Sequence, residues 1–215
     1  MNSTIDLIAK LSSEAKPIKP MIKPKQWLVR LLLILGIYGI ATQTFLGLRP
    51  DLFIQFTRSL FAVEIILMLS LFLASIIAAV LNIYPDLYQK SFWLKIPYII
   101  FLLILGFFIS QIFMPISGLA VIPTGIFHKV ECTICIIFVA VIPAMLIFTI
   151  LKKGATIKPL QAGSFTVLAA SSLGYLILRF SEANDAISHL LIWHYLPMIC
   201  FAILGSVIGK FFLKW

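Results

Sequence analysis

Residues 128–153 read HKVECTICIIFVAVIPAMLIFTILKK, and this stretch decides the fold. The twenty residues from Cys132 to Leu151 carry no formal charge. At about 1.5 Å of rise per helical residue, the run is about 30 Å long, which matches the hydrocarbon core of a bilayer. The stretch therefore predicts a membrane-spanning helix with thiols at one end and Lys152 and Lys153 at the other.

The composition extends this prediction to the whole chain. Of the 215 residues, 61% are hydrophobic and 12% are charged, and the mean hydropathy is +1.09. A soluble domain cannot cover so much apolar surface with so few charges. The apolar runs are unbroken rather than alternating, which excludes a transmembrane β-barrel. We therefore predict an all-α membrane protein. The polar first 26 residues contain no signal-peptide core, and three cysteines are too few for a disulfide framework.

Six apolar runs, separated by segments rich in proline, glycine and charge, are long enough to cross a bilayer. The predicted spans are residues 27–46, 60–81, 96–113, 132–151, 162–178 and 190–212. Residues 27–215 are thus expected to form a six-helix transmembrane domain, preceded by a tail over residues 1–26. The last span carries Gly205-xxx-Gly209, whose commoner use is packing inside the chain and whose alternative use is homodimerisation.

The basic residues predict the orientation of this domain. Lysine and arginine collect on the cytoplasmic side of membrane proteins. Of the 17 lysines and arginines, all but a few fall in the tail, the second and fourth loops and the C-terminus. The exceptions are Arg49, Arg58, Lys129 and Arg179. We predict that both termini are cytoplasmic and that Cys132 and Cys135 face outward.

The tail combines a short amphipathic helix with a stiff basic linker. Ile5, Ile8 and Leu11 recur at helical spacing, and Leu7 broadens the same face. Prolines and lysines alternate over residues 16–25, which favours an extended linker. A helix this short is marginal alone in water, so its apolar face needs a partner. That partner is either the anionic lipid surface or a cytoplasmic protein.

Four residues that could bind a metal or react with an oxidant share one face at the start of the fourth span. They are His128, Glu131, Cys132 and Cys135. One helix cannot wrap four groups around one ion, because this face spans about 10 Å. A complete site needs a further ligand, and His189 or His194 is a candidate. The two histidines lie about 140° apart on an α-helix, so we do not expect them to act together as an i,i+4 pair would.

Each of these residues also has a purely structural interpretation. Small cysteines pack well in membrane helices, while the CxxC spacing of Cys132 and Cys135 also suits a metal- or oxidant-responsive site or a redox enzyme. Histidines beside Trp193 and Tyr195 fit an interfacial aromatic belt. Cys200 lies inside the last span and is expected to be inert. Glu64 suits an ion pathway, or a structural role in which it is neutral or paired with an arginine.

Several scattered segments together resemble the NrsF-type integral-membrane anti-sigma factors. The segments that carry the resemblance are Asp6-Leu-Ile-Ala-Lys-Leu11, Ala15-Lys-Pro17-Ile, Gly47-Leu-Arg-Pro-Asp-Leu52, Glu131-Cys132, Val141-Ile-Pro143-Ala, Lys152-Lys-Gly-Ala155 with Pro159, Gly163, Ile192-Trp-His194, and Gly205-xxx-Gly209 with the closing Leu213-Lys-Trp215. The similarity covers essentially the whole chain.

The resemblance implies a bacterial inner-membrane protein that holds an extracytoplasmic-function sigma factor inactive. It also implies release of that sigma factor when periplasmic cysteines meet heavy metal or oxidative stress. Cys132 matches one cysteine of the family. Phe180 stands where the second is expected, just after the fifth span, and Cys135 is the candidate to replace it.

We therefore expect an anti-sigma factor, not an enzyme, with no cofactor and no direct contact with nucleic acid. The sigma factor would bind through Ile5, Leu7, Ile8 and Leu11. The site for the signal would draw on Cys132, Cys135, His128 and Glu131. The candidate ligands for any metal are Cys132, Cys135, His128 and His189. Two alternatives are a membrane thiol-disulfide oxidoreductase using the CxxC pair and a transporter of small solutes or metal. The broken helices and intramembrane charges typical of a transporter are scarce in this sequence.

Overall fold

A computed structural model describes residues 2–14, 22–84, 91–113 and 130–213. Predictions that involve His128, the outer loop over 115–125 and most of the proline–lysine linker lie outside these residues. Over the described parts of the chain every regular element is helical. The elements are α1 (Asn2–Glu14), α2 (Pro24–Leu46), α3 (Leu52–Phe56), α4 (Ser59–Leu81), α5 (Ser91–Phe113), α6 (Val130–Leu151), α7 (Pro159–Ser181), α8 (Ile187–His189), the π-helix η3 (Leu190–Tyr195) and α9 (Leu196–Phe212).

Six helices are long and apolar enough to cross a membrane, and they indicate a multi-pass membrane protein. They coincide with the six predicted spans and begin up to five residues earlier, as at Ser91 in α5. Two of the early starts have a simple cause. Pro24 and Pro159 occupy the first turns of α2 and α7, where proline needs no backbone partner and its fixed φ favours helix.

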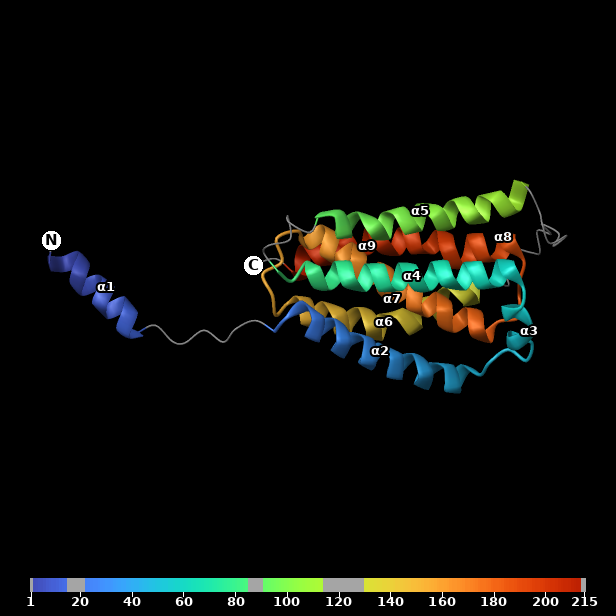
Figure 1. The fold of residues 1–215 in the computed structure, drawn as a ribbon, viewed down its shortest axis with the longest axis horizontal. Helices are drawn as coiled ribbons and strands as arrows, with labels where there is room; N and C mark the ends of the chain where they lie inside the picture. The colour runs from blue at the N-terminus through green and yellow to red at the C-terminus, as the bar shows by residue number, and fades with distance from the viewer. Residues whose placement is uncertain (1, 15–21, 85–90, 114–129, 214–215) are drawn as a thin grey trace.

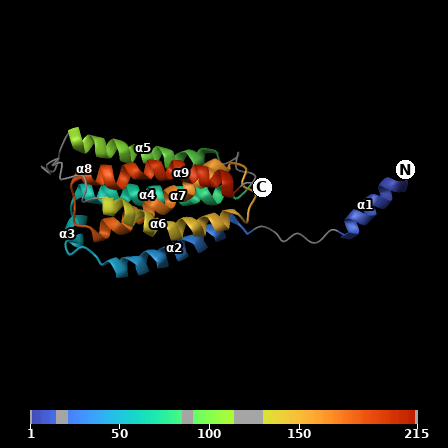
Figure 2. The same cartoon turned by 180° about the vertical axis from the view of Figure 1, so that it is seen from behind.

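The long helices lie side by side and alternate in direction (Figure 1). The start of α2 and the end of α9 lie at one end of the bundle, which we call the tail end. The short helices α3 and α8 lie at the opposite end, the cap end, and the reverse view agrees (Figure 2). Helix α1 lies apart from the bundle, with Ile5, Leu7, Ile8 and Leu11 exposed. Because successive long helices alternate in direction, consecutive connections between them lie at opposite ends of the bundle.

Helix α7 is the centre of the bundle. It packs against α9, α4 and α6 and more lightly against α2, and it is buried along nearly its whole length. Its many alanines, serines and glycines allow these neighbours to approach closely. The surrounding helices instead expose large apolar side chains outward, such as Phe45, Phe113 and Phe138. Such an apolar exterior is suited to contact with lipid rather than water.

The closest helix contact joins α7 to α9 through three glycines. A Cβ atom placed on Gly163 would lie 2.1 Å from the Gly205 carbonyl oxygen and 2.7 Å from the Gly209 Cα. These are backbone atoms, which cannot move aside without separating the helices. The Gly205-xxx-Gly209 motif is therefore used for packing inside the chain.

Gly163→Ala should destabilise the bundle by about 1–3 kcal/mol, because the added methyl group must force α7 and α9 apart. Gly106→Ala in α5 is the matched control, since a Cβ there meets nothing within 4 Å. Alanine favours helix over glycine by about 0.5–1 kcal/mol, so the control should be neutral or stabilised. Thermal unfolding in detergent micelles measures both variants. Equal midpoints for the two would contradict the close contact.

Candidate functional site

Polar side chains gather at the cap end, where they form two neighbouring clusters. The ion-pair network consists of Arg49, Asp51, Glu64, Arg179 and Asp185. The Cys–His cluster consists of Cys132, Glu182, His189 and His194. Tyr175 lies between them: its hydroxyl donates to Glu64 Oε1 at 2.6 Å, and its ring stands edge-on to that of His194 at 5.5 Å.

The ion-pair network joins α4, α7 and the two connections at the cap end. Arg179 Nε donates to Glu64 Oε1 at 2.8 Å, and Arg179 Nη2 lies 2.7 Å from Asp185 Oδ1. Arg49 lies in the connection after α2 and binds Asp185 at 2.9 Å and Asp51 at 2.7 Å. Both arginines and Glu64 are buried. The structure thus confirms the arginine-paired interpretation of Glu64.

The arginines keep the carboxyl groups outside the spans ionised. Hydrogen bonds from Arg49 and Gln55 lower the pKa of Asp51 below its usual range. Burial raises the pKa of Asp185, but hydrogen bonds and charge from Arg49 and Arg179 lower it by more. The paired carboxylates in turn raise the pKa of Arg49. Two guanidinium groups therefore face three carboxylates, and the network formally carries one net negative charge.

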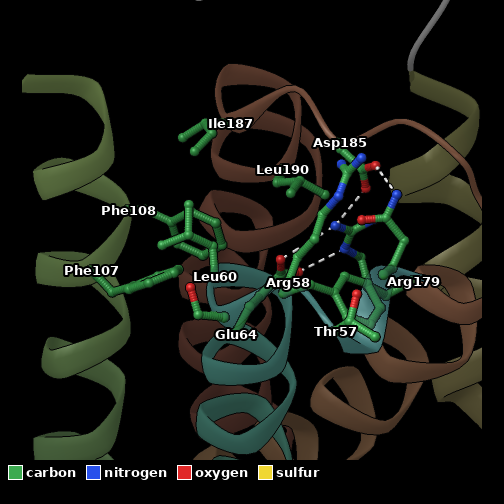
Figure 3. A pocket seen from close by; sticks show the side chains of 13 residues that line it. Thr57, Arg58, Leu60, Glu64, Phe107, Phe108, Arg179, Asp185, Ile187 and Leu190 are labelled. Atoms are coloured by element: carbon green, nitrogen blue, oxygen red, sulfur yellow. Dashed lines mark hydrogen bonds and ion pairs between the residues drawn. The ribbon is translucent and has the colours of Figure 1, made fainter. Parts of the chain in front are cut away.

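A cavity of about 630 Å³ opens beside this network. Glu64, Arg179 and Asp185 form its polar wall, and Phe107 and Phe108 of α5 line the apolar side (Figure 3). The exposed Arg58 also lines it. The charged groups of this wall pair with one another, although Arg179 Nη1 has no hydrogen-bond partner among the described residues. The pairing makes the network a structural clamp between α4, α7 and the connections.

The Cys–His cluster brings together three separate segments. Cys132 lies in the first turn of α6, Glu182 directly follows α7, and the histidines belong to α8 and η3. Cys132 Sγ lies 3.4 Å from Glu182 Oε2. His189 Nε2 lies 3.0 Å from Glu182 Oε1, and His194 Nε2 lies 3.1 Å from Glu182 Oε2. One ligand atom from each of the four residues lies within 4.8 Å of all the others.

The two imidazoles are close to Glu182 without completing hydrogen bonds to it. Both distances are short enough, but neither ring nitrogen has a hydrogen-bond partner among the described residues. His189 is 3% exposed and His194 is 0% exposed, so the protein encloses both rings. We therefore treat these contacts as electrostatic proximity rather than as hydrogen bonds.

Glu182 is an anion in this setting. Burial raises the pKa of its carboxyl group, but the imidazoles of His189 and His194 lower it by more, so the net shift is downward. Glu182 thereby places a negative charge between two buried rings and beside a thiol.

The π-helix explains why the prediction for the two histidines was wrong. On an α-helix His189 and His194 would point about 140° apart. Over η3 the backbone instead follows i→i+5 hydrogen bonding, as in the bond from the Leu196 N–H to the Leu191 carbonyl. Residues five apart then face the same way, and the two ring centroids are only 4.9 Å apart. Both rings are buried, so they do not form an interfacial aromatic belt.

The other predicted site residues lie around the cluster rather than in it. Cys135 and the exposed Glu131 line a surface cavity of about 440 Å³, whose wall also includes Cys132, Glu182 and His189. Thus the cavity connects the cluster with the outside of the bundle. All three cysteines are free thiols, and Cys200 lies exposed on α9 away from this cavity.

Sequence reasoning missed Glu182 as a partner of Cys132. One signal was available: Glu182 stands two residues after Phe180, which the family resemblance had marked as the place of a second cysteine. Helix α7 ends at Ser181, between Phe180 and Glu182. Because the chain leaves the helix between these two positions, Glu182 can reach the same partner, Cys132, that a side chain at position 180 would reach.

Comparison with known families finds a match over nearly the full length of the chain. The model of the NrsF family, described as negative regulator of sigma F, matches residues 11–215. The chain belongs to the NrsF family. No curated protein and no solved structure gave a significant match.

Membership of the NrsF family indicates a general role for this chain. The family description indicates a negative regulator of a sigma factor, and hence a sigma factor as the partner. The six apolar helices place that regulator among multi-pass membrane proteins.

Proposed function

We propose that this NrsF-family chain is an anti-sigma factor of the bacterial inner membrane, which binds an extracytoplasmic-function sigma factor through α1. The family match is the observation that carries the proposal. It begins at Leu11, so the docking role of Ile5, Leu7 and Ile8 rests on their exposure instead. An exposed apolar face on a helix of 13 residues requires a partner, and a sigma factor meets that need.

We infer the orientation from the lysines. Lys152 and Lys153 lie directly after α6, at the tail end, and their amino groups lie over the rings of Phe212 and Trp27. Cationic residues and tryptophan together are typical of the cytoplasmic interface. This orientation places the tail in the cytoplasm and Cys132 at the outer face. The chain then receives its signal at the cap end and binds its partner at the tail end.

Two helices connect these ends. Glu182 at the end of α7 contacts Cys132, and Arg179 one turn earlier holds Glu64 of α4. Just beyond the other end of α4, the Tyr84 hydroxyl donates to the Ile22 carbonyl at the base of the tail. A metal or an oxidant that acts on Cys132 changes its contact with α7, and a shift of α7 against α4 moves the base of the tail. The signal must favour one packing of the bundle over the other for this to work.

The docking proposal is tested with charges placed on the apolar face of α1. In Ile8→Glu the sigma factor should be retained at least ten-fold less well, because an acidic side chain would be buried at the interface without a partner. Co-purification of a co-expressed sigma factor with the full-length protein measures this. Ser13→Glu adds the same charge to an exposed polar position of α1 and should leave binding unchanged. Equal retention by both variants would refute docking through this face.

A further inference from the structure

Four ligand-type atoms of the Cys–His cluster surround one point at the cap end. We propose that this point is a binding site for one divalent ion of the zinc class, held by Cys132 Sγ, a Glu182 carboxylate oxygen, His189 Nε2 and His194 Nε2. This set differs from the one predicted on the sequence, since it omits Cys135 and Glu131 and includes Glu182 and both histidines. The ion would join α6, α7 and the start of the last span.

The distances fit tetrahedral coordination. Zinc binds nitrogen and oxygen at about 2.0–2.2 Å and sulfur at about 2.3 Å, so neighbouring ligand atoms of a tetrahedron lie about 3.3–3.6 Å apart. His194 Nε2 and Cys132 Sγ lie 3.1 and 3.4 Å from Glu182 Oε2. His189 Nε2 lies 3.0 Å from the other oxygen of the same carboxylate, Oε1. The remaining separations within the cluster do not exceed 4.8 Å. Side-chain movements of about 1 Å would bring all four atoms to a common ion.

The burial of the histidines is the independent reason to expect a ligand. Both rings are more than nine-tenths buried, and their Nε2 atoms point to Glu182 without a directed hydrogen bond. A buried polar atom without a partner costs about 1–3 kcal/mol, and folded proteins contain few of them. Coordination would use the lone pair of each Nε2 atom and give that atom a partner.

The chemistry of the four ligands selects the class of ion. One sulfur and two imidazoles favour Zn²⁺, and its analogues Co²⁺ and Cd²⁺, over Mg²⁺ and Ca²⁺, which prefer oxygen ligands only. On binding, the Cys132 thiol loses its proton to solvent, and the sulfur–metal bond forms. The thiolate and the Glu182 carboxylate then balance the charge of the ion. Four protein ligands close the site, which is typical of structural rather than catalytic zinc.

The π-helix η3 has a specific purpose in this interpretation. It turns His194 to the same side as His189, as described above. The carbonyl of Trp193, which lies within η3, accepts a hydrogen bond from Thr133 Oγ1 at 2.5 Å. Thr133 directly follows Cys132, so the same bond positions the cysteine against η3. Single-turn π-helices inside α-helices occur frequently at functional sites. The cavity beside Cys132 supplies a path for the ion from outside.

Metal binding is tested on the purified full-length protein, stripped of metal and prepared without a histidine tag. The wild type should bind one Zn²⁺ per chain, and Co²⁺ should give a sulfur-to-cobalt charge-transfer band together with tetrahedral visible bands. Cys132→Ser should abolish the charge-transfer band, and His194→Gln should weaken Zn²⁺ binding at least ten-fold. Cys200→Ser removes an exposed cysteine outside the cluster and should behave like the wild type.

A second readout guards against variants that only misfold. Zn²⁺ should raise the thermal unfolding midpoint of the wild type and of Cys200→Ser, because an ion that binds the folded state stabilises it. It should not raise the midpoint of His194→Gln, even where that variant unfolds cooperatively without metal. Wild-type binding no tighter than that of the Cys132→Ser and His194→Gln variants would overturn the site.

The inference deepens the proposed function and rests on it only for the effect of the ion on the sigma factor. Binding of the metal alone is measured without that partner, so the two ideas fail separately. Zinc bound at the four ligands with no change in sigma-factor retention would leave the site intact and remove its role in release. Loss of docking through α1 would leave the metal measurements unaffected.

Discussion

Arg179→Leu should be among the most damaging single substitutions in the bundle, with an expected loss of about 3–5 kcal/mol in the free energy of unfolding. The substitution removes the cation that pairs with Glu64 and Asp185. Asp185 retains Arg49, but Glu64 is 5% exposed and, within the described part of the chain, keeps only the hydroxyl of Tyr175. A buried carboxylate without its cation is far less stable than the same group in water. Thermal and denaturant unfolding in detergent micelles would measure the loss.

Two further variants distinguish the cost of leaving the Glu64 carboxylate buried without a cation from the cost of lost packing. The double variant Arg179→Leu/Glu64→Leu removes both charges and should be more stable than Arg179→Leu alone, since no anion is left buried. Arg58→Leu is the matched control, because Arg58 lies exposed at the same end with no ion pair among the described residues. It should change stability by less than about 0.5 kcal/mol. Additive losses in the double variant would show that the Glu64–Arg179 pair is not energetically coupled.

Cys132→Ser should uncouple the signal from the sigma factor while leaving repression intact. Serine has nearly the shape of cysteine, so the bundle and the tail should stay folded and the sigma factor should stay bound. A serine hydroxyl neither binds soft metals nor reacts with peroxide as a thiolate does. We therefore expect a reporter driven by the sigma factor to remain at its unstressed level when cells meet Cd²⁺ or peroxide, whereas the wild type responds to at least one of them.

The other two cysteines make this experiment specific. Cys200→Ser should respond like the wild type, because Cys200 lies exposed on α9 and outside the cavity at Cys132. Cys135→Ser decides whether the thiol one turn further on replaces the second cysteine of the family. A Cys132→Ser variant that still releases the sigma factor on both challenges would exclude Cys132 as the sensing group. High reporter activity without any challenge would instead indicate a folding or docking defect.

Much of the architecture could be predicted because it depends on local properties of the chain. An uninterrupted apolar run of about twenty residues is sufficient to predict a spanning helix wherever it lies, and the six predicted spans agree with the six long helices. The arginine pairing of Glu64 was also predictable in kind, since an isolated carboxylate among apolar residues needs a cation. Its partner was not, because Arg179 lies 115 positions away on a different helix.

The candidate site was predicted only in part, for two identifiable reasons. The i, i+3, i+4, i+7 pattern correctly marked the start of α6, but it holds only within one helix and therefore selected Cys135 and Glu131 instead of Glu182. The angle between His189 and His194 was computed for an α-helix, and η3 changes the number of residues per turn over those positions. No local sequence signal that we used distinguishes a π-helix from an α-helix.

The sequence alone determined that the chain consists of apolar helices, approximately where each one lies, and which ends carry the lysines. These properties follow from free energies of transfer and from sterics, which act on neighbouring residues. Only the tertiary structure decided that Cys132, Glu182, His189 and His194 meet at one point. Their meeting depends on the rotation of each helix about its axis, which is set by the close contact of Gly163 with Gly205 and Gly209, by the Arg179–Glu64 pair and by the wider turn of η3.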